Sequence, residues 1–217
     1  MLVRARGAAV LARGRRALSI AVREPRVGLM SGSTRKGSVN TQLVHAAAAL
    51  LAKRGAQVEI IDLDAFDLPM FGQEIEAAAW PEAATRLQAA FAACDAFAVS
   101  SPEYNGMPPP LLLNVYTWLS RGAGVAALQK TAVVLAASPG ALGGMRALRP
   151  HREILTNLGC CVLPQMVAVG SAFAAFAADG ALLEGAPAKM LEGACEALYV
   201  AAKHDANRAA TAKLLNL

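Results

Sequence analysis

The stretch SGSTRKGSVN, residues 31–40, gathers groups that bind anions: four hydroxyls, two cations, one amide and two glycines. An apolar run, Val27–Met30, precedes it, and a helical pattern, Thr41–Arg54, follows it. The free N–H groups of a helix N-terminus attract anions, and an arginine fork fits phosphate. The stretch therefore predicts a phosphate cradle, with a capped helix start that needs no ligand as the alternative. Its side-chain donors are Ser33, Thr34, Arg35, Ser38 and Asn40.

The common nucleotide-binding motifs do not account for this stretch. Gly32 and Gly37 have the spacing of a Walker A loop, but Ser38 follows where that motif needs lysine. Lys36 lies before the second glycine, so it cannot extend from the helix start toward terminal phosphates. The dinucleotide fingerprint also fails, because Gly28 and Gly32 have the wrong spacing.

Two further loops carry residues that suit a planar ligand. SSPEYNGMPPP, residues 100–110, offers an aromatic ring, an amide and a glycine, and SPGALGGMRAL, residues 138–148, offers three glycines. Glycine lets backbone approach a flat ring closely. Each loop can also be interpreted as a turn that needs no ligand. Asn-Gly makes tight turns, proline starts helices and glycine supplies turn geometry.

Apolar runs alternate with helical patterns along the chain, which predicts an α/β domain with a five-stranded parallel sheet covered by helices on both faces. The predicted strands are Arg26–Met30, Gln57–Leu63, Ala96–Ser100, Thr131–Ala137 and Cys161–Val169. The predicted helices span Thr41–Arg54, residues 82–93, Pro108–Leu119, Gly144–Leu158 and residues 187–203. Ligands bind beyond the carboxyl ends of such strands. The loops after strands one, three and four together therefore predict a site for a phosphorylated planar cofactor.

Four segments, GSTRKGSVN, PEYNG, LLNVYTWLSR and SPGALGGMRALRPHREILTNLG, resemble the NADPH-dependent FMN reductases in their order and spacing, over roughly residues 26–183. The resemblance implies a flavodoxin-like fold, FMN as cofactor and NADPH or NADH as co-substrate. The implied reaction passes electrons from NAD(P)H through FMN to a small acceptor, such as a quinone, azo compound, free flavin or metal oxyanion. The resemblance also implies a homodimer or homotetramer. The apolar helix Leu111–Leu119, with Trp118, offers either a subunit contact or a cover for the sheet.

The resemblance assigns cofactor-binding residues in all three loops. Those matched to the FMN-phosphate loop are Ser33, Arg35, Ser38 and Asn40. Those matched to the segment along the isoalloxazine are Pro102, Glu103, Tyr104, Asn105 and Gly106, and those on the ring's other side are Ser138, Gly140, Gly143 and Gly144. The chain departs from the family at Met107-Pro108, at Leu113 and Thr117, where charges are common, and at Pro150.

The sequence predicts no catalytic acid or base, because FMN carries the chemistry. It also predicts no metal site, since no C-x-x-C pair supports zinc. His45, His151 and His204 fall in helical stretches and are interpreted as structural or surface groups. Backbone N–H groups near Asn105-Gly106 are expected to stabilise negative charge at the flavin N1–O2 edge. A non-enzymatic flavodoxin-like electron carrier is the competing function, although such carriers are strongly acidic and lack arginine in the phosphate loop. A scaffold that has lost its cofactor is a third possibility.

The positive charge of the chain is concentrated at its N-terminus. Six of the 21 Lys and Arg residues and no acid fall within residues 1–23, which leaves 15 basic and 16 acidic residues in the rest. This balance does not favour a nucleic-acid groove. Residues 1–23 have the composition of an organellar transit peptide or of a plain extension, expected to be dispensable for folding. Residues 24–217 are expected to form one reductase domain.

Cysteine use and hydropathy bear on the compartment. The four cysteines form no C-x-x-C pair and are predicted as buried free thiols of a reducing compartment: Cys94, Cys160, Cys161 and Cys195. Adjacent Cys160 and Cys161 should point to opposite faces of a strand. The uncharged window Ile154–Ala178 has the length of a membrane span, but Pro164 and other breakers interrupt it, so none is predicted. The expected location is the cytoplasm, or a mitochondrion or plastid if residues 1–23 are an address.

Overall fold

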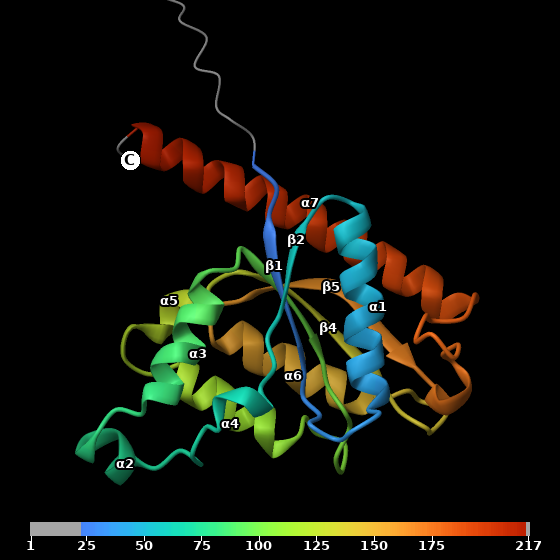
Figure 1. Ribbon diagram of the computed structural model, residues 1–217, viewed down its shortest axis with the longest axis horizontal. Coiled ribbons are helices and arrows are strands. Elements are labelled where there is room, and N and C mark those ends of the chain that lie inside the picture. The colour runs from blue at the N-terminus through green and yellow to red at the C-terminus, as the bar shows by residue number, and fades with distance from the viewer. Residues whose placement is uncertain (1–22, 216–217) are drawn as a thin grey trace, which may run out of the picture.

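The computed structural model describes residues 23–215, which form one parallel sheet covered by helices on both faces (Figure 1). The strands are β1 (Arg26–Ser31), β2 (Gln57–Ile60), β3 (Ala96–Ser100), β4 (Thr131–Ala137) and β5 (Cys161–Val169), in the order β2-β1-β3-β4-β5. The flavodoxin-like fold is therefore confirmed. β3, β4 and β5 have the predicted bounds, and β2 ends three residues earlier than predicted.

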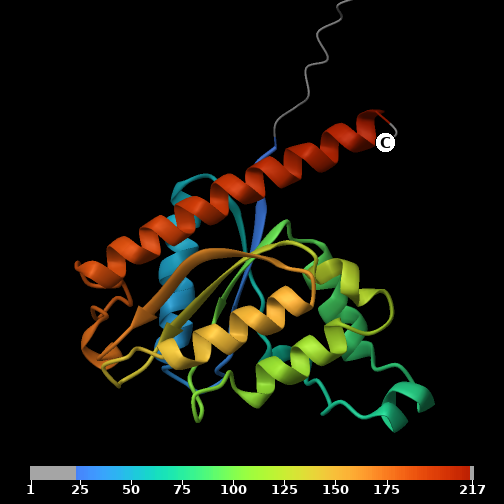
Figure 2. The ribbon, with the colours of Figure 1, turned by 180° about the vertical axis from the view of Figure 1, so that it is seen from behind.

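Two layers of helices enclose the sheet (Figures 1 and 2). One face is covered by α1 (Val39–Lys53) and α7 (Ala186–Leu215). The other is covered by α3 (Glu82–Ala92), α4 (Pro110–Leu119), the short α5 (Val125–Leu128) and α6 (Met145–Asn157). The remaining elements are α2 (Gln73–Ala78) and the 3-10 turns η1 (Asp64–Phe66), η2 (Gly122–Gly124) and η3 (Ala172–Ala174).

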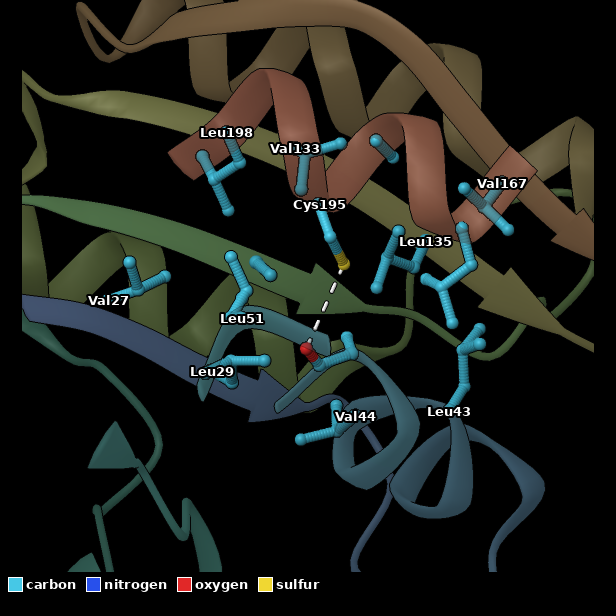
Figure 3. Packing of buried hydrophobic residues seen from close by; sticks show 14 of the residues in the cluster. Val27, Leu29, Leu43, Val44, Leu51, Val133, Leu135, Val167, Cys195 and Leu198 are labelled. Carbon is cyan, nitrogen blue, oxygen red and sulfur yellow. Dashed lines mark hydrogen bonds between the residues drawn. The ribbon is translucent and has the colours of Figure 1, made fainter. Parts of the chain in front are cut away.

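Successive strand side chains point to opposite faces, so the sheet supports two cores. Figure 3 shows the core under α1 and α7, where Leu29, Val133 and Leu198 pack together. In this core the Cys195 thiol donates to the Ala47 carbonyl at 3.8 Å, and burial raises the pKa of Cys195 to about 12. The thiol therefore stays protonated and behaves as a small apolar side chain.

The cysteines are free, as predicted, but they are not all buried. Cys160, which immediately precedes β5, is buried, whereas Cys161, the first residue of β5, is exposed. The prediction of burial is wrong for Cys161, because β5 lies at the edge of the sheet and helices do not cover its first residue.

An arm between β2 and α3, residues 67–80, packs on α4 and was not predicted from the sequence. Trp118 of α4 is fully buried beneath Phe71 and Trp80, with ring centroids 5.0 and 5.5 Å away. Its indole N–H donates to the Pro69 carbonyl at 2.8 Å. Trp118 is thus covered by the arm, so the prediction of an exposed Trp118 stripe is wrong. The other prediction, a cover for the sheet, is confirmed for the residues of α4 that lie in the core with the strands, Leu112, Val115 and Leu119.

β5 is an interrupted edge strand. Its pairing with β4 contains a register shift between Ala132 and Val134, and the exposed Pro164 lies opposite this region. The Arg152 guanidinium of α6 donates to the carbonyls of Val162 and Leu163. None of the helices within residues 23–215 has the length and apolar character that crossing a membrane requires.

The N-terminal end of the described chain is held by polar contacts. Arg23 forms an ion pair with Asp95 at 2.6 Å and bonds to Asn207 of α7 through its backbone N–H at 3.1 Å. α7 is longer than predicted, and its last turns extend beyond β1 (Figure 1). The predictions made for residues 1–23 fall on residues outside those described, apart from Arg23.

Candidate functional site

The three loops selected from the sequence meet at the carboxyl edge of the sheet. Hydrogen bonds join their roots: the Gly32 N–H donates to the Ser100 carbonyl at 2.8 Å, and the Ser101 N–H donates to the Leu135 carbonyl at 2.8 Å. β1 leads to α1 on one face, whereas β3 leads to α4 on the other. The adjacent loops after β1 and β3 therefore diverge, which makes this edge the topological switch point where such folds bind ligands.

The loop after β1 has the donor set of an anion cradle. Within the described chain, no hydrogen bond engages the backbone N–H groups of residues 34–37. Thr34, Arg35 and Lys36 are exposed beside them, and Gly37 turns the chain with φ of +69°. Consecutive free N–H groups next to a helix N-terminus bind phosphate well. The residues present therefore fit the phosphate of FMN.

A cavity of about 440 Å³ opens beside this loop. Residues of the loop and of α1 form one wall, and residues 60–64, from the end of β2 onward, form the other. The first wall brings Arg35, Lys36 and His45 to the cavity, and the second brings Asp62 and Asp64. The sequence prediction missed both acids. Asp62 fell inside the predicted strand Gln57–Leu63, whereas Asp64 directly followed it, which was the available signal.

Ser38 and Asn40 are turned away from this cavity. Ser38 is 2% exposed and acts as the N-cap of α1, since its hydroxyl accepts from the Asn40 N–H at 3.2 Å. The Asn40 side chain is 3% exposed and bonds to Ser100 and Ala137. Of the four residues matched to the phosphate loop, the structure thus brings Ser33 and Arg35 to the cavity.

The loop after β3 folds into a two-residue hairpin. Tyr104 and Met107 exchange backbone hydrogen bonds at 2.9 and 3.0 Å, and Asn105 and Gly106 have φ of +54° and +79°. These angles match a type I′ turn, for which Asn-Gly is the preferred pair. The hairpin leaves Tyr104 and Asn105 exposed, whereas Pro102 is buried at its base.

An ion pair ties this hairpin to the loop after β4. The Glu103 carboxylate, whose side chain is 8% exposed, accepts from Arg146 in the first turn of α6 at 2.5 Å. The Glu103 carboxylate is therefore paired with a side chain of the protein itself. The ion pair joins the two loops that are predicted to flank the ring.

The loop after β4 contains two accessible residues and two buried glycines among those predicted to contact the ring. Ser138 is half-buried and Gly140 is exposed, so both border the open side of the loop. Gly143 and Gly144 are buried: a Cβ on Gly143 would lie 2.6 Å from Val169 and Gly170 backbone atoms, and one on Gly144 would lie 2.8 Å from Ala136. The close approach expected of these two glycines is made to the protein's own strands.

The histidines occupy three different settings. His45 lines the cavity and His204 is exposed, whereas His151 is fully buried beneath α4. The His151 Nε2 and the Tyr116 hydroxyl are 2.6 Å apart, and burial lowers the pKa of His151 to about 4. His151 is therefore neutral at physiological pH. Residues 23–215 contain no group of three His, Cys, Asp or Glu side chains arranged to hold a metal ion.

Comparison with known proteins gives a consistent result. The sequence profile of the NADPH-dependent FMN reductases matches residues 25–174. An NAD(P)H-dependent FMN reductase of Pseudomonas aeruginosa is 31% identical over 172 residues, covering 79% of this chain and 91% of that protein. A quinone reductase of Pseudomonas putida is 33% identical over 149 residues, covering 67% of this chain and 78% of that protein. The structure of FerB, a flavoenzyme NAD(P)H:(acceptor) oxidoreductase from Paracoccus denitrificans, superposes with a TM-score of 0.73 at 30% identity, covering 83% of this chain and 98% of that one.

Proposed function

Because the chain belongs to the NADPH-dependent FMN reductase family, we propose that its anion cradle holds the FMN phosphate and that the loops after β3 and β4 hold the ring. The protein is an FMN-dependent NAD(P)H oxidoreductase that acts on small acceptors. Bound FMN would supply the redox chemistry that links NAD(P)H to the acceptor. The observation that carries the assignment is the row of free N–H groups at residues 34–37, at the switch point of this fold.

The chain's own residues bind and orient the cofactor. The cradle and Arg35 supply donors for a dianionic phosphate at the start of α1. The hairpin supplies backbone N–H groups at Asn105 and Gly106 for the electron-rich edge of the ring. Arg146 holds the Glu103 carboxylate and so fixes the hairpin against α6. A site of this kind needs no acid or base at the reacting atoms.

Replacing Arg35 with alanine should weaken FMN binding by about ten- to a hundredfold. The change removes charge-assisted hydrogen bonds to phosphate, which are worth about 1.5–3 kcal/mol. Riboflavin, which lacks the phosphate, should bind the wild type and the variant about equally. Fluorescence titration of the apoprotein with both flavins measures the effect. Equal losses for the two flavins would remove the phosphate role from Arg35.

The acceptor and the choice of nicotinamide co-substrate are tested together. Purified protein should oxidise NADH or NADPH in the presence of a quinone, free flavin, azo dye or metal oxyanion, and the ratio of kcat/KM values ranks these substrates. An electron carrier would bind FMN yet show no turnover with either nicotinamide. A colourless protein that rejects added FMN would support a scaffold without cofactor.

We also propose a homodimer or homotetramer. Met107 at the hairpin and Leu113 on the outer side of α4 are 46% and 37% exposed, and contact with a second copy would cover them. Sedimentation at micromolar concentration should give a multiple of the 22.4 kDa chain mass. A wild-type monomer would contradict the proposal, and Leu113→Asp should shift a genuine assembly toward monomers if this face is used.

We place the enzyme in a reducing compartment, the cytoplasm in the first instance. The support is chemical: Cys94, Cys160, Cys161 and Cys195 are all free thiols. An organellar address in residues 1–23 stays a prediction. Fusing these residues to a fluorescent reporter in a eukaryotic cell tests it, and a diffuse cytosolic signal would reject it.

A further inference from the structure

Asn40, in the first turn of α1, bonds across the sheet to the end of β4. Its Nδ2 donates to the Ala137 carbonyl at 2.9 Å, and its Oδ1 accepts from the Ala137 N–H at 2.9 Å. The Oδ1 also accepts from the Ser100 hydroxyl at 2.9 Å. One amide thus joins α1, which follows the first loop, to the ends of β3 and β4, where the other two loops of the site begin.

These contacts leave the amide little capacity for a ligand. Both acceptor positions of Oδ1 are filled, and Nδ2 has already used one of its two hydrogens. The side chain is 3% exposed and is not among the residues that line the cavity beside the cradle. A phosphate at residues 34–37 would therefore meet Arg35 and the backbone while Asn40 stays in the protein interior.

We infer that Asn40 is a positioning residue, which sets the phosphate cradle against the two loops that hold the ring and does not itself bind phosphate. The inference rests on the proposed FMN site. Asparagine suits this task because it donates and accepts at once, so it pairs with both backbone groups of Ala137 as a neighbouring peptide would. Aspartate lacks the donor, and alanine would leave the Ala137 carbonyl and N–H buried and unpaired.

Comparing two flavins separates positioning from phosphate binding. In apoprotein titrations, Asn40→Ala should weaken FMN and riboflavin by the same factor, about tenfold, since it frees the cradle and a ring loop together. Arg35→Ala should weaken FMN alone. The visible circular dichroism of bound flavin, which reports the surroundings of the ring, should change in Asn40→Ala and stay unchanged in Arg35→Ala.

Asn114 offers a matched control. It is a second buried asparagine that pairs with one backbone carbonyl and one backbone N–H, those of Pro69 and Phe71, at 3.0 and 2.8 Å. These contacts anchor the arm on α4. Asn114→Ala should lower the melting temperature of the apoprotein much as Asn40→Ala does, yet leave both flavin affinities within about twofold of wild type.

Ser100→Ala provides a second test of the positioning role if Asn40→Ala does not fold. It removes only the hydroxyl that donates to Oδ1, from a residue that is fully buried. It should weaken both flavins equally, by about two- to fivefold. Loss of FMN affinity without loss of riboflavin affinity, in either variant, would overturn the inference and make Asn40 a phosphate ligand. Failure of the wild type to bind FMN would overturn the proposed function, and the inference with it.

Discussion

Gly143→Ala should lower the free energy of unfolding by about 2–5 kcal/mol, because the added methyl meets backbone that cannot move aside. Its Cβ would lie 2.6 Å from the Val169 carbonyl carbon and from the Gly170 nitrogen. The residue also has φ of +62°, a conformation that alanine adopts only at a cost. Urea unfolding of the apoprotein measures the loss. Flavin affinity should fall as well, since the loop after β4 has to shift.

Gly140→Ala is the internal comparison for this prediction. Gly140 belongs to the same loop, has no unusual φ, and a Cβ there would approach nothing closer than the Ser138 hydroxyl at 3.7 Å. Its unfolding free energy should stay within about 0.5 kcal/mol of wild type, as for ordinary surface changes. Equal destabilisation by the two substitutions would show that the fit of Gly143 against β5 does not limit stability.

The buried His151 should make the protein lose about 3 kcal/mol of stability as the pH falls from 6.5 to 4. Burial lowers its folded-state pKa to about 4, from 6.5 in an unfolded chain. Below pH 6.5, His151 is therefore protonated in the unfolded state but remains neutral in the folded state, so acid favours unfolding. The difference in pKa, converted at 1.36 kcal/mol per unit, gives the stated size. Above about pH 7.5, where the unfolded-state histidine is also neutral, the contribution no longer changes with pH.

His151→Gln isolates this contribution because glutamine retains a polar group for Tyr116 but does not titrate. Other titrating groups affect both proteins alike, so the difference between their urea unfolding curves from pH 7.5 to 4.5 belongs to His151. Tyr116→Phe removes the hydrogen bond at 2.6 Å and keeps the histidine, so it should retain the pH dependence. A variant His151→Gln with the same pH dependence as wild type would contradict the assignment.

The sheet could be predicted closely because its inner strands are buried on both faces. β3 and β4 read as continuous apolar runs, and their observed bounds equal the predicted ones. β2 was predicted too long because Ile61 and Leu63 remain buried after the strand has ended. Hydropathy reports burial and does not report strand pairing. α7 was predicted too short, since its apolar stripe weakens while no glycine or proline stops the helix before residue 215.

The sequence led to the place of the candidate site, but not to the direction of its side chains. Residue types predicted an anion cradle in the loop around Arg35, and the fold puts that loop at the switch point. The same types could not show that Ser38 caps a helix or that Asn40 points into the protein. Both orientations depend on partners far away in sequence, such as Ala137, which only the folded chain brings close.

The interrupted edge at β5 limits how copies of this protein can join. A strand from another molecule needs an unbroken row of N–H and C=O groups to extend a sheet, as in fibrils. Pro164 has no N–H to offer, and Arg152 already occupies the carbonyls of Val162 and Leu163. The opposite edge, β2, is only four residues long. Heating or concentrating the enzyme should therefore not readily template cross-β aggregates from its native sheet, and native self-association is left to helices and loops.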